Sequence, residues 1–166
     1  MAVHDILRYP DARLKQISEP VTNFDATLKT LLRDLEDTMR AGPGSVGIAA
    51  PQINMFLRVV IVDVSSRPDI RQHGCLRLVN PEIVWREGEV SGREGCMSVP
   101  DYTGNVLRAA RIRIRAQEME GEWRTWECEG YEARAIQHEL DHLDGLLFLD
   151  RVVSPRRDLF RRKVYR

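Results

Sequence analysis

Apolar residues recur at helical spacing between Asp25 and Arg40, with charged residues between them. Steps of three and four residues place them on one face of a helix. These apolar positions are Leu28, Leu31, Leu32, Leu35 and Met39. Asn23 or Asp25 can cap the start, and Gly42-Pro43 ends the pattern. The stretch therefore predicts an N-terminal amphipathic helix that packs one face on a sheet.

Later stretches have the patterns of strands. Residues 57–63 are a β-branched run, which predicts a strand buried on both faces. Residues 111–116 alternate strictly between arginine and apolar positions, which is typical of a strand with one face in water. Gly121 offers a turn into residues 123–129, so these two strands are expected to form a hairpin. Further strands are predicted at residues 76–85, interrupted by Asn80-Pro81, and at residues 88–93.

The last third of the chain predicts a second helix, from Tyr131 to Leu143, with Gly145 as its C-terminal cap. Several strands before a late helix, without regular βαβ alternation, indicate an α+β fold with mixed or largely antiparallel strands. Residues 154–166 are rich in arginine and are expected to form a basic C-terminal helix. Two interpretations of this segment remain open: a solvated helix packed on the body, or an arm that contacts phosphates.

Composition limits the classes of protein. A chain of 166 residues fits one domain, residues 1–166. Equal numbers of basic and acidic residues, 25 of each, give no global field that attracts nucleic acid, so no sequence-specific nucleic-acid partner is expected. No apolar run reaches membrane-spanning length, and the N-terminus lacks a leader pattern. We therefore expect a cytoplasmic monomer without a membrane partner.

The three cysteines are too few for a disulfide scaffold. Cys75 and Cys128 lie in strand-like runs and are interpreted as core residues. His73, in a polar loop, is expected to be simply exposed. Only Cys96 is left for chemistry.

The second predicted helix carries Gln137-His138-Glu139-Leu140-Asp141-His142. Histidines four residues apart are separated by about 40° around the helix axis, so both imidazoles can reach one point. Glu139 is rotated by about 100° from His138 and lies beside that point. Two imidazoles and a neighbouring carboxylate suit metal-assisted hydrolysis. Taken alone, the motif also fits a solvated helix, because His-Glu-x-x-His recurs by chance.

A catalytic metal site of this kind needs a third protein ligand, which could be Glu, Asp, His or Cys outside the helix. Cys96 stands out because Gly95 frees the backbone beside it and Pro100 closes the loop. A thiolate with two neutral imidazoles suits zinc, and also ferrous iron, nickel or cobalt.

Three motifs, in this order, resemble those of the peptide deformylase family. They are Val46-Gly47-Ile48-Ala49-Ala50-Pro51-Gln52, Glu94-Gly95-Cys96-Met97-Ser98 and Gln137-His138-Glu139-Leu140-Asp141-His142. Weaker likeness covers nearly the whole chain. Two positions depart from the family pattern: Ser45 replaces a usual glycine, and Met97 replaces a frequent leucine. Ser45 bears on substrate affinity, whereas Met97 keeps its backbone N–H.

The resemblance implies a metal-dependent amidase that removes the formyl group from the N-terminal formyl-methionine of newly synthesised polypeptides and releases formate. It implies one divalent ion per chain, physiologically Fe2+, with Zn2+, Ni2+ or Co2+ as alternatives. The implied metal ligands are Cys96, His138 and His142. Glu139 would act as general base and acid on the attacking water. Gln52 and the Met97 N–H would stabilise the oxyanion.

The predicted substrate-binding residues are Val46, Gly47, Ile48, Glu94, Gly95, Tyr131 and Ala135. The pocket for the methionine side chain would be formed by four of them, although each also fits a core position: Val46, Ile48, Tyr131 and Ala135. Backbone around Gly47 and Gly95 would pair with the substrate as a strand does. Glu94 and Gln137 are expected to orient ligands through hydrogen bonds. Asp141 and Asp144 are assigned to the helix surface or to ion pairs.

The predicted fold is thus α+β, with strands packed around a central metal-binding helix. Bacterial family members use a C-terminal helix near the ribosomal exit tunnel, so the resemblance also implies ribosome contact through residues 154–166. Two alternatives are a metallopeptidase that cleaves internal bonds and a metal-binding protein without turnover. Cys96 and the short chain disfavour the first, and the presence of Glu139 and Gln52 disfavours the second.

Overall fold

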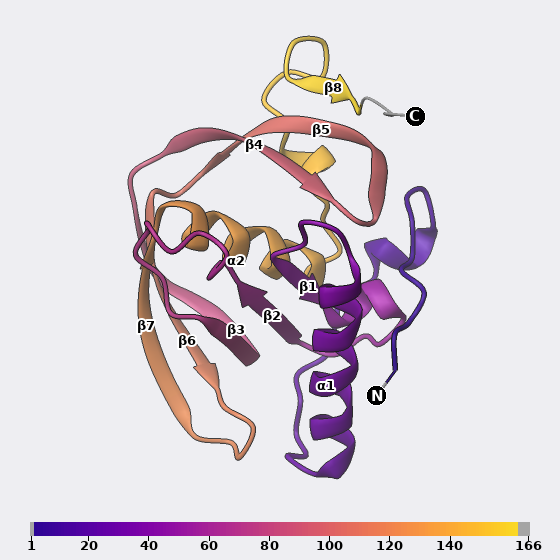
Figure 1. Ribbon diagram of the computed structural model, residues 1–166, viewed down its shortest axis with the longest axis vertical. Helices are drawn as coiled ribbons and strands as arrows, with labels where there is room; N and C mark the ends of the chain where they lie inside the picture. Colours follow the sequence, from indigo (N-terminus) through magenta and orange to yellow (C-terminus); the bar gives the residue numbers. More distant parts are fainter. Residues whose placement is uncertain (1, 163–166) are drawn as a thin grey trace.

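The computed structural model describes residues 2–162 of the chain (Figure 1). The helices are η1 (Ala12–Lys15), α1 (Ala26–Ala41), η2 (Ala50–Ile53), α2 (Gly130–Leu143) and η3 (Phe148–Arg151), the η helices being of the 3-10 type. The strands are β1 (Gly47–Ala49), β2 (Val59–Asp63), β3 (Cys75–Glu87), β4 (Val90–Cys96), β5 (Val99–Arg108), β6 (Arg111–Gln117), β7 (Trp123–Glu129) and β8 (Leu159–Arg161). None of the helices in the described part is long and apolar enough to cross a membrane.

Two antiparallel sheets enclose helix α2. The five-stranded sheet has the order β1-β2-β3-β6-β7, and the three-stranded sheet has the order β4-β5-β8. Every strand pair in both sheets is antiparallel. Figure 1 shows α2 between the two sheets, with β4 and β5 crossing over it. The α+β class with antiparallel sheets is confirmed.

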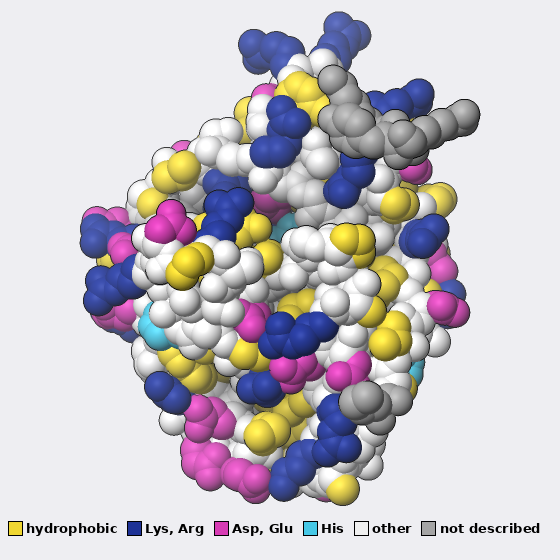
Figure 2. Space-filling model, in the orientation of Figure 1, with side chains coloured by type: hydrophobic (Ala, Val, Ile, Leu, Met, Phe, Trp, Pro, Cys, Tyr) yellow, Lys and Arg dark blue, Asp and Glu magenta, His cyan; other side chains and the backbone are white. Residues whose placement is uncertain are grey.

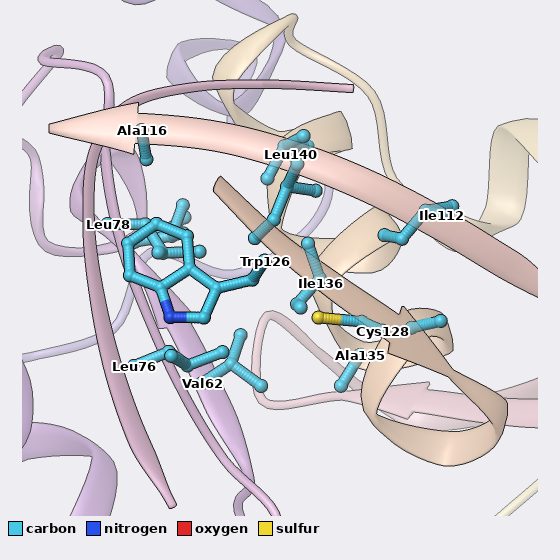
Figure 3. Close-up of a cluster of buried hydrophobic side chains, with 14 of the residues drawn as sticks. Val62, Leu76, Leu78, Ile112, Ala116, Trp126, Cys128, Ala135, Ile136 and Leu140 are labelled. Carbon is cyan, nitrogen blue, oxygen red and sulfur yellow. The ribbon is translucent and has the colours of Figure 1, made fainter. Parts of the chain in front are cut away.

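Strand β2 is buried on both of its faces, as its β-branched run predicts. Val60 and Val62 belong to the hydrophobic cluster between the sheet and α2, whereas Val59 and Ile61 belong to the cluster under α1. All four side chains are fully buried. In Figure 3, side chains from β2, β3, β6 and β7 converge on Ile136 and Leu140 of α2. The apolar face of α2 is therefore fixed against the five-stranded sheet.

Helix α1 forms where its periodicity predicts. Its side-chain cap is Asp25, whose Oδ1 accepts a hydrogen bond from the Leu28 N–H at 3.1 Å, and Gly42 lies at its C-terminal cap. All five apolar positions of the pattern are buried. They pack on the face of the sheet that α2 leaves free.

Two strands differ from the sequence expectations. Strand β3 continues through Asn80, which adopts a positive φ of 51° and bonds Val21 through its side chain. The register with β6 shifts at this point. Strand β5 was not expected, because residues 99–108 have no alternation of apolar and polar positions that would mark them. Its pairing with β4 turns the expected loop around Cys96 into a hairpin.

The expected basic C-terminal helix is wrong for the described part of residues 154–166. Pro155–Arg157 form a turn, and β8 pairs with β5 through Thr103 and Phe160. Because β5 lies between β4 and β8, its second edge is paired and its backbone groups there are satisfied. The hydrogen-bonded edge thus determines the local structure more strongly than helix propensity does. Residues 163–166 lie outside the described residues.

Candidate metal centre

Helix α2 and the β4–β5 hairpin bring three metal-ligating side chains to one point. His138 and His142 project from the same face of α2, and Cys96 lies at the end of β4. The Sγ atom of Cys96 is 3.4 Å from Nε2 of His142. The three ligand atoms all lie within 4.8 Å of one another. A thiol that precedes both histidines by more than forty residues is thus placed opposite their imidazoles.

A buried carboxylate orients His138. The Nδ1 of His138 donates a hydrogen bond to Oε1 of Glu94 at 2.9 Å. This bond leaves the Nε2 of His138 directed to the point where the three ligand atoms meet. Arg108 binds the same carboxylate through two nitrogens, each at 2.9 Å. Burial alone would raise the pKa of Glu94, but the bonds from Arg108 and His138 lower it to about 2. Glu94 therefore stays ionised and holds the imidazole in a fixed tautomer.

The thiol of Cys96 is electrostatically prepared to bind a cation. Its burial would raise its pKa, but the imidazoles of His142 and His138 outweigh this effect and hold the pKa well below its usual value. A thiolate is the form of cysteine that ligates metals.

Arg108 and Asp141 extend the buried network. Arg108 Nη1 donates to Asp141 at 2.6 Å, and Arg151 donates twice to the same carboxylate. Of the two roles expected for Asp141, the structure shows the ion pair, and the side chain is buried instead of lying on the helix surface. Sequence reasoning missed Arg108, because nothing in the sequence sets it apart from the three other arginines in residues 108–115.

Gln137 does not contact a metal ligand, contrary to expectation. Its amide bonds the backbone N–H and carbonyl of Ala109 and the carbonyl of Ala133. The side chain therefore connects α2 to the chain between β5 and β6. This role cannot be inferred from the helix motif.

Glu139 lies beside the three ligands in a buried position. Within residues 2–162 its Oε1 has no hydrogen-bond partner, and this atom is 4.0 Å from Nε2 of His142. Burial raises the pKa of Glu139 to about 7, although His138 and His142 oppose the rise. Such a carboxyl group can both take and return a proton near neutral pH. A Cβ on Gly47 would lie 2.6 Å from Oε2 of Glu139, so glycine is needed there for the carboxylate to keep its place.

Gln52 has a defined amide orientation. Its Oε1 accepts a hydrogen bond from the Ala49 N–H at 2.9 Å, so its Nε2 faces the metal-ligating side. Nε2 is 3.0 Å from Oγ of Ser98 and 3.5 Å from Sγ of Cys96. Ser98, a partner that sequence reasoning did not assign, helps to fix this donor.

A cleft of about 380 Å³ opens onto these groups, between β1 and β4. Figure 2 shows this face of the molecule, which is hollowed near its centre. The expected site residues that line the cleft are Val46, Gly47, Gln52, Glu94, Gly95, Cys96, Met97, Tyr131, Ala135, His138 and Glu139. Ile48 does not line it, because its side chain is fully buried in the cluster under α1. Arg134 and Arg162 also line the cleft, although no pattern in the sequence predicts them there.

The cysteine and the two histidines, with the carboxylate beside them, are a set of groups that suits one divalent metal ion. The ligand types suit zinc, iron, nickel or cobalt. Fold and site together define a metal-dependent hydrolase.

Comparison with known proteins gives the family. Residues 3–158 match the family model described as polypeptide deformylase. The peptide deformylase of Heliobacterium modesticaldum is 49% identical over 154 residues, which cover 92% of this chain and 95% of that protein.

Solved structures that are similar to this chain are also peptide deformylases. A peptide deformylase from Legionella pneumophila has a TM-score of 0.85 and 41% identity, with 93% of this chain and 88% of that chain covered. A class I type b peptide deformylase from Acinetobacter baumannii, crystallised with bound Met-Ala-Ser, has a TM-score of 0.84 and 35% identity, with 91% and 99% covered. The chain belongs to the polypeptide deformylase family.

Proposed function

We propose that this protein removes the formyl group from the N-terminal formyl-methionine of newly synthesised polypeptides. The observation that carries the proposal is the convergence of Cys96, His138 and His142 beside the buried carboxylate of Glu139. The Met-Ala-Ser bound to the Acinetobacter baumannii relative has the chemistry of a deformylated product.

The metal in this proposal is one divalent ion held by Cys96, His138 and His142. When bound, it would polarise the formyl carbonyl and make hydroxide available near neutral pH. We propose Fe2+ as the physiological ion, and the same ligands suit Zn2+, Ni2+ and Co2+. The Cys96 thiolate would make a ferrous site sensitive to oxygen, since the thiolate itself can be oxidised.

Glu139 is the proposed general base and acid. It would take a proton from the attacking water and return it to the departing amine. Its raised pKa, about 7, suits both transfers at neutral pH. Gly47 keeps the space in front of the carboxylate open, because it has no Cβ.

Two donors are proposed for the oxyanion that forms at the formyl carbon. Gln52 would supply its Nε2 amide, which the Ala49 N–H turns toward the site. Met97 lines the same cleft and would supply its backbone N–H. The loss of one such donor typically lowers the rate by about 10²–10³.

The substrate would lie along the edge of β1. This strand is the first of the five-stranded sheet, and among residues 2–162 a strand pairs with one of its edges only. Gly47 lines the cleft. A peptide added there as a further strand would be held through its backbone, which tolerates many sequences. Val46, Tyr131 and Ala135 would contact the methionine side chain at the cleft wall.

Release of formate from formyl-Met-Ala-Ser by anaerobically purified protein tests the proposal. Turnover should stop with a chelator and return with ferrous or nickel ion. Acetyl-Met-Ala-Ser is the matched control, since it differs only in the acyl group. A fully metallated protein that releases no formate would overturn the proposed function and favour a binding protein without turnover.

A further inference from the structure

A second group of potential ligands lies at the start of α2, apart from the cleft. It consists of His73 in the connection between β2 and β3, Cys128 in β7 and Glu132 in the first turn of α2. Nδ1 of His73 is 2.6 Å from Oε1 of Glu132 and 3.9 Å from Sγ of Cys128. The three ligand atoms lie within 4.8 Å of one another. His73 is thus more than an exposed loop residue.

We propose that His73, Cys128 and Glu132 form a second metal site, suited to a divalent ion of the zinc class. Bonds of about 2.0–2.3 Å around a tetrahedral ion place its ligand atoms roughly 3–4 Å apart. The two observed distances are close to this range, so small side-chain movements would complete the site. A thiolate, a carboxylate and a neutral imidazole would together neutralise a dication.

The burial of Glu132 supports a cation at this point. The side chain is 1% exposed, and both of its oxygens contact His73, one at the backbone N–H and one at Nδ1. In the part of the chain that the structure describes, no lysine or arginine pairs with it. A buried carboxylate without a full counter-charge is costly, and a bound dication would remove that cost.

The geometry disfavours a catalytic Cys–His–Glu relay. In such a relay the thiol and the carboxylate contact opposite nitrogens of the imidazole. Here both face Nδ1 of His73. Burial and the Glu132 carboxylate raise the pKa of the Cys128 thiol, which makes it a poor nucleophile without a metal. Convergence on one point is the arrangement of a metal site.

An ion could reach this position from solvent. His73 lines two surface cavities, of about 390 and 400 Å³, and Cys128 and Glu132 line the first of them. A bound ion would connect the β2–β3 segment, β7 and α2. Because Glu132 precedes His138 by six residues in the same helix, the ion would anchor the start of the helix that carries the first site.

Cobalt binding to the full chain with Cys96→Ala tests the proposal. This substitution removes the thiolate of the first site, so the near-ultraviolet absorption of a thiolate–cobalt bond would report on the other cysteines. We expect about one such thiolate-bound ion per chain. The band should disappear with an added Cys128→Ser or His73→Ala and persist with Cys75→Ser, the matched control.

His73→Ala keeps the test valid if Cys128→Ser fails to fold, since the His73 side chain is a third exposed. The proposal is overturned if the Cys96→Ala chain shows no thiolate band, or if the band survives His73→Ala. A band that follows Cys75 would also overturn it. Formate release is not measured, so this result stands apart from the test of the proposed function.

Discussion

Glu94 accepts a 2.9 Å hydrogen bond from His138, and both side chains are buried. In Glu94→Gln the imidazole loses its charged partner, and Arg108 keeps only one of its two carboxylate partners, Asp141. Disruption of such a bond behind a metal ligand typically lowers metal affinity by about 10–100-fold. Competition with a chelator measures the effect. Glu118→Gln is the control, because the Glu118 side chain is 44% exposed and pairs with Arg124 instead of a metal ligand. It should leave affinity unchanged, and equal affinity in both variants would mean that Glu94 does not support the ligand.

Acid stability of the metal-free protein provides a second prediction. The pKa of Glu94 in the folded state is about 2, below its usual 4.5, so the unfolded state binds the proton more readily. Its stabilising contribution is complete above about pH 5 and is lost as pH falls toward 2. Denaturant unfolding at several pH values should show this decline, with a shallower slope in Glu94→Gln. Parallel slopes would count against the assigned pKa.

Ser45 affects the edge of β1 that the substrate would use. Its hydroxyl donates to the Gly47 carbonyl at 3.2 Å, which competes with a substrate N–H for that acceptor. Ser45→Gly should therefore lower KM by about 2–10-fold, the worth of one net hydrogen bond, with kcat little changed. Steady-state kinetics on formyl-Met-Ala-Ser give both constants. A KM that stays the same or rises would show that this carbonyl does not pair with substrate.

The sequence was most informative where side-chain pattern alone determines structure. The periodicity of α1, the β-branched run of β2 and the alternation of β6 each predict an element that the structure contains. The helical spacing of His138 and His142 likewise places both imidazoles on one face. In these cases the burial of one or two faces of an element determines which positions in the sequence are apolar.

The remaining features depend on contacts between distant segments. Strand β5 is fixed by its partners β4 and β8, so its own residues carry no clear pattern. The turn and strand of the C-terminal segment arise because β5 offers a free edge. Arg108 reaches both Glu94 and Asp141 only after the hairpin lies over α2. The burial of Ile48 also depends on a distant segment, because α1 packs on that side of β1.

The basic C-terminal segment gives a prediction about the ribosome. Basic side chains gather at the end of the molecule near β8, as Figure 2 shows, and Arg156 and Arg157 are exposed in the turn before it. If this turn contacts ribosomal phosphates, the joint change Arg156→Glu and Arg157→Glu should weaken ribosome binding and reduce its salt dependence. Co-sedimentation at several salt concentrations measures both. The joint change Arg113→Glu and Arg115→Glu, on β6 of the five-stranded sheet, is a control with the same change in charge. Equal losses in both double variants would rule out a specific contact.

The central claim is that the cysteine and the two histidines hold the metal, whereas Glu139 transfers protons and is not needed for metal binding. Glu139→Ala should keep the metal content of the wild-type protein while formate release falls by about 10²–10⁴, because the proton transfers lose their carboxylate. The decisive measurement is metal content and turnover on the same anaerobic sample of this variant. Retained metal with lost turnover is the predicted result. Metal lost together with turnover would show that Glu139 has a structural role and would contradict the mechanism.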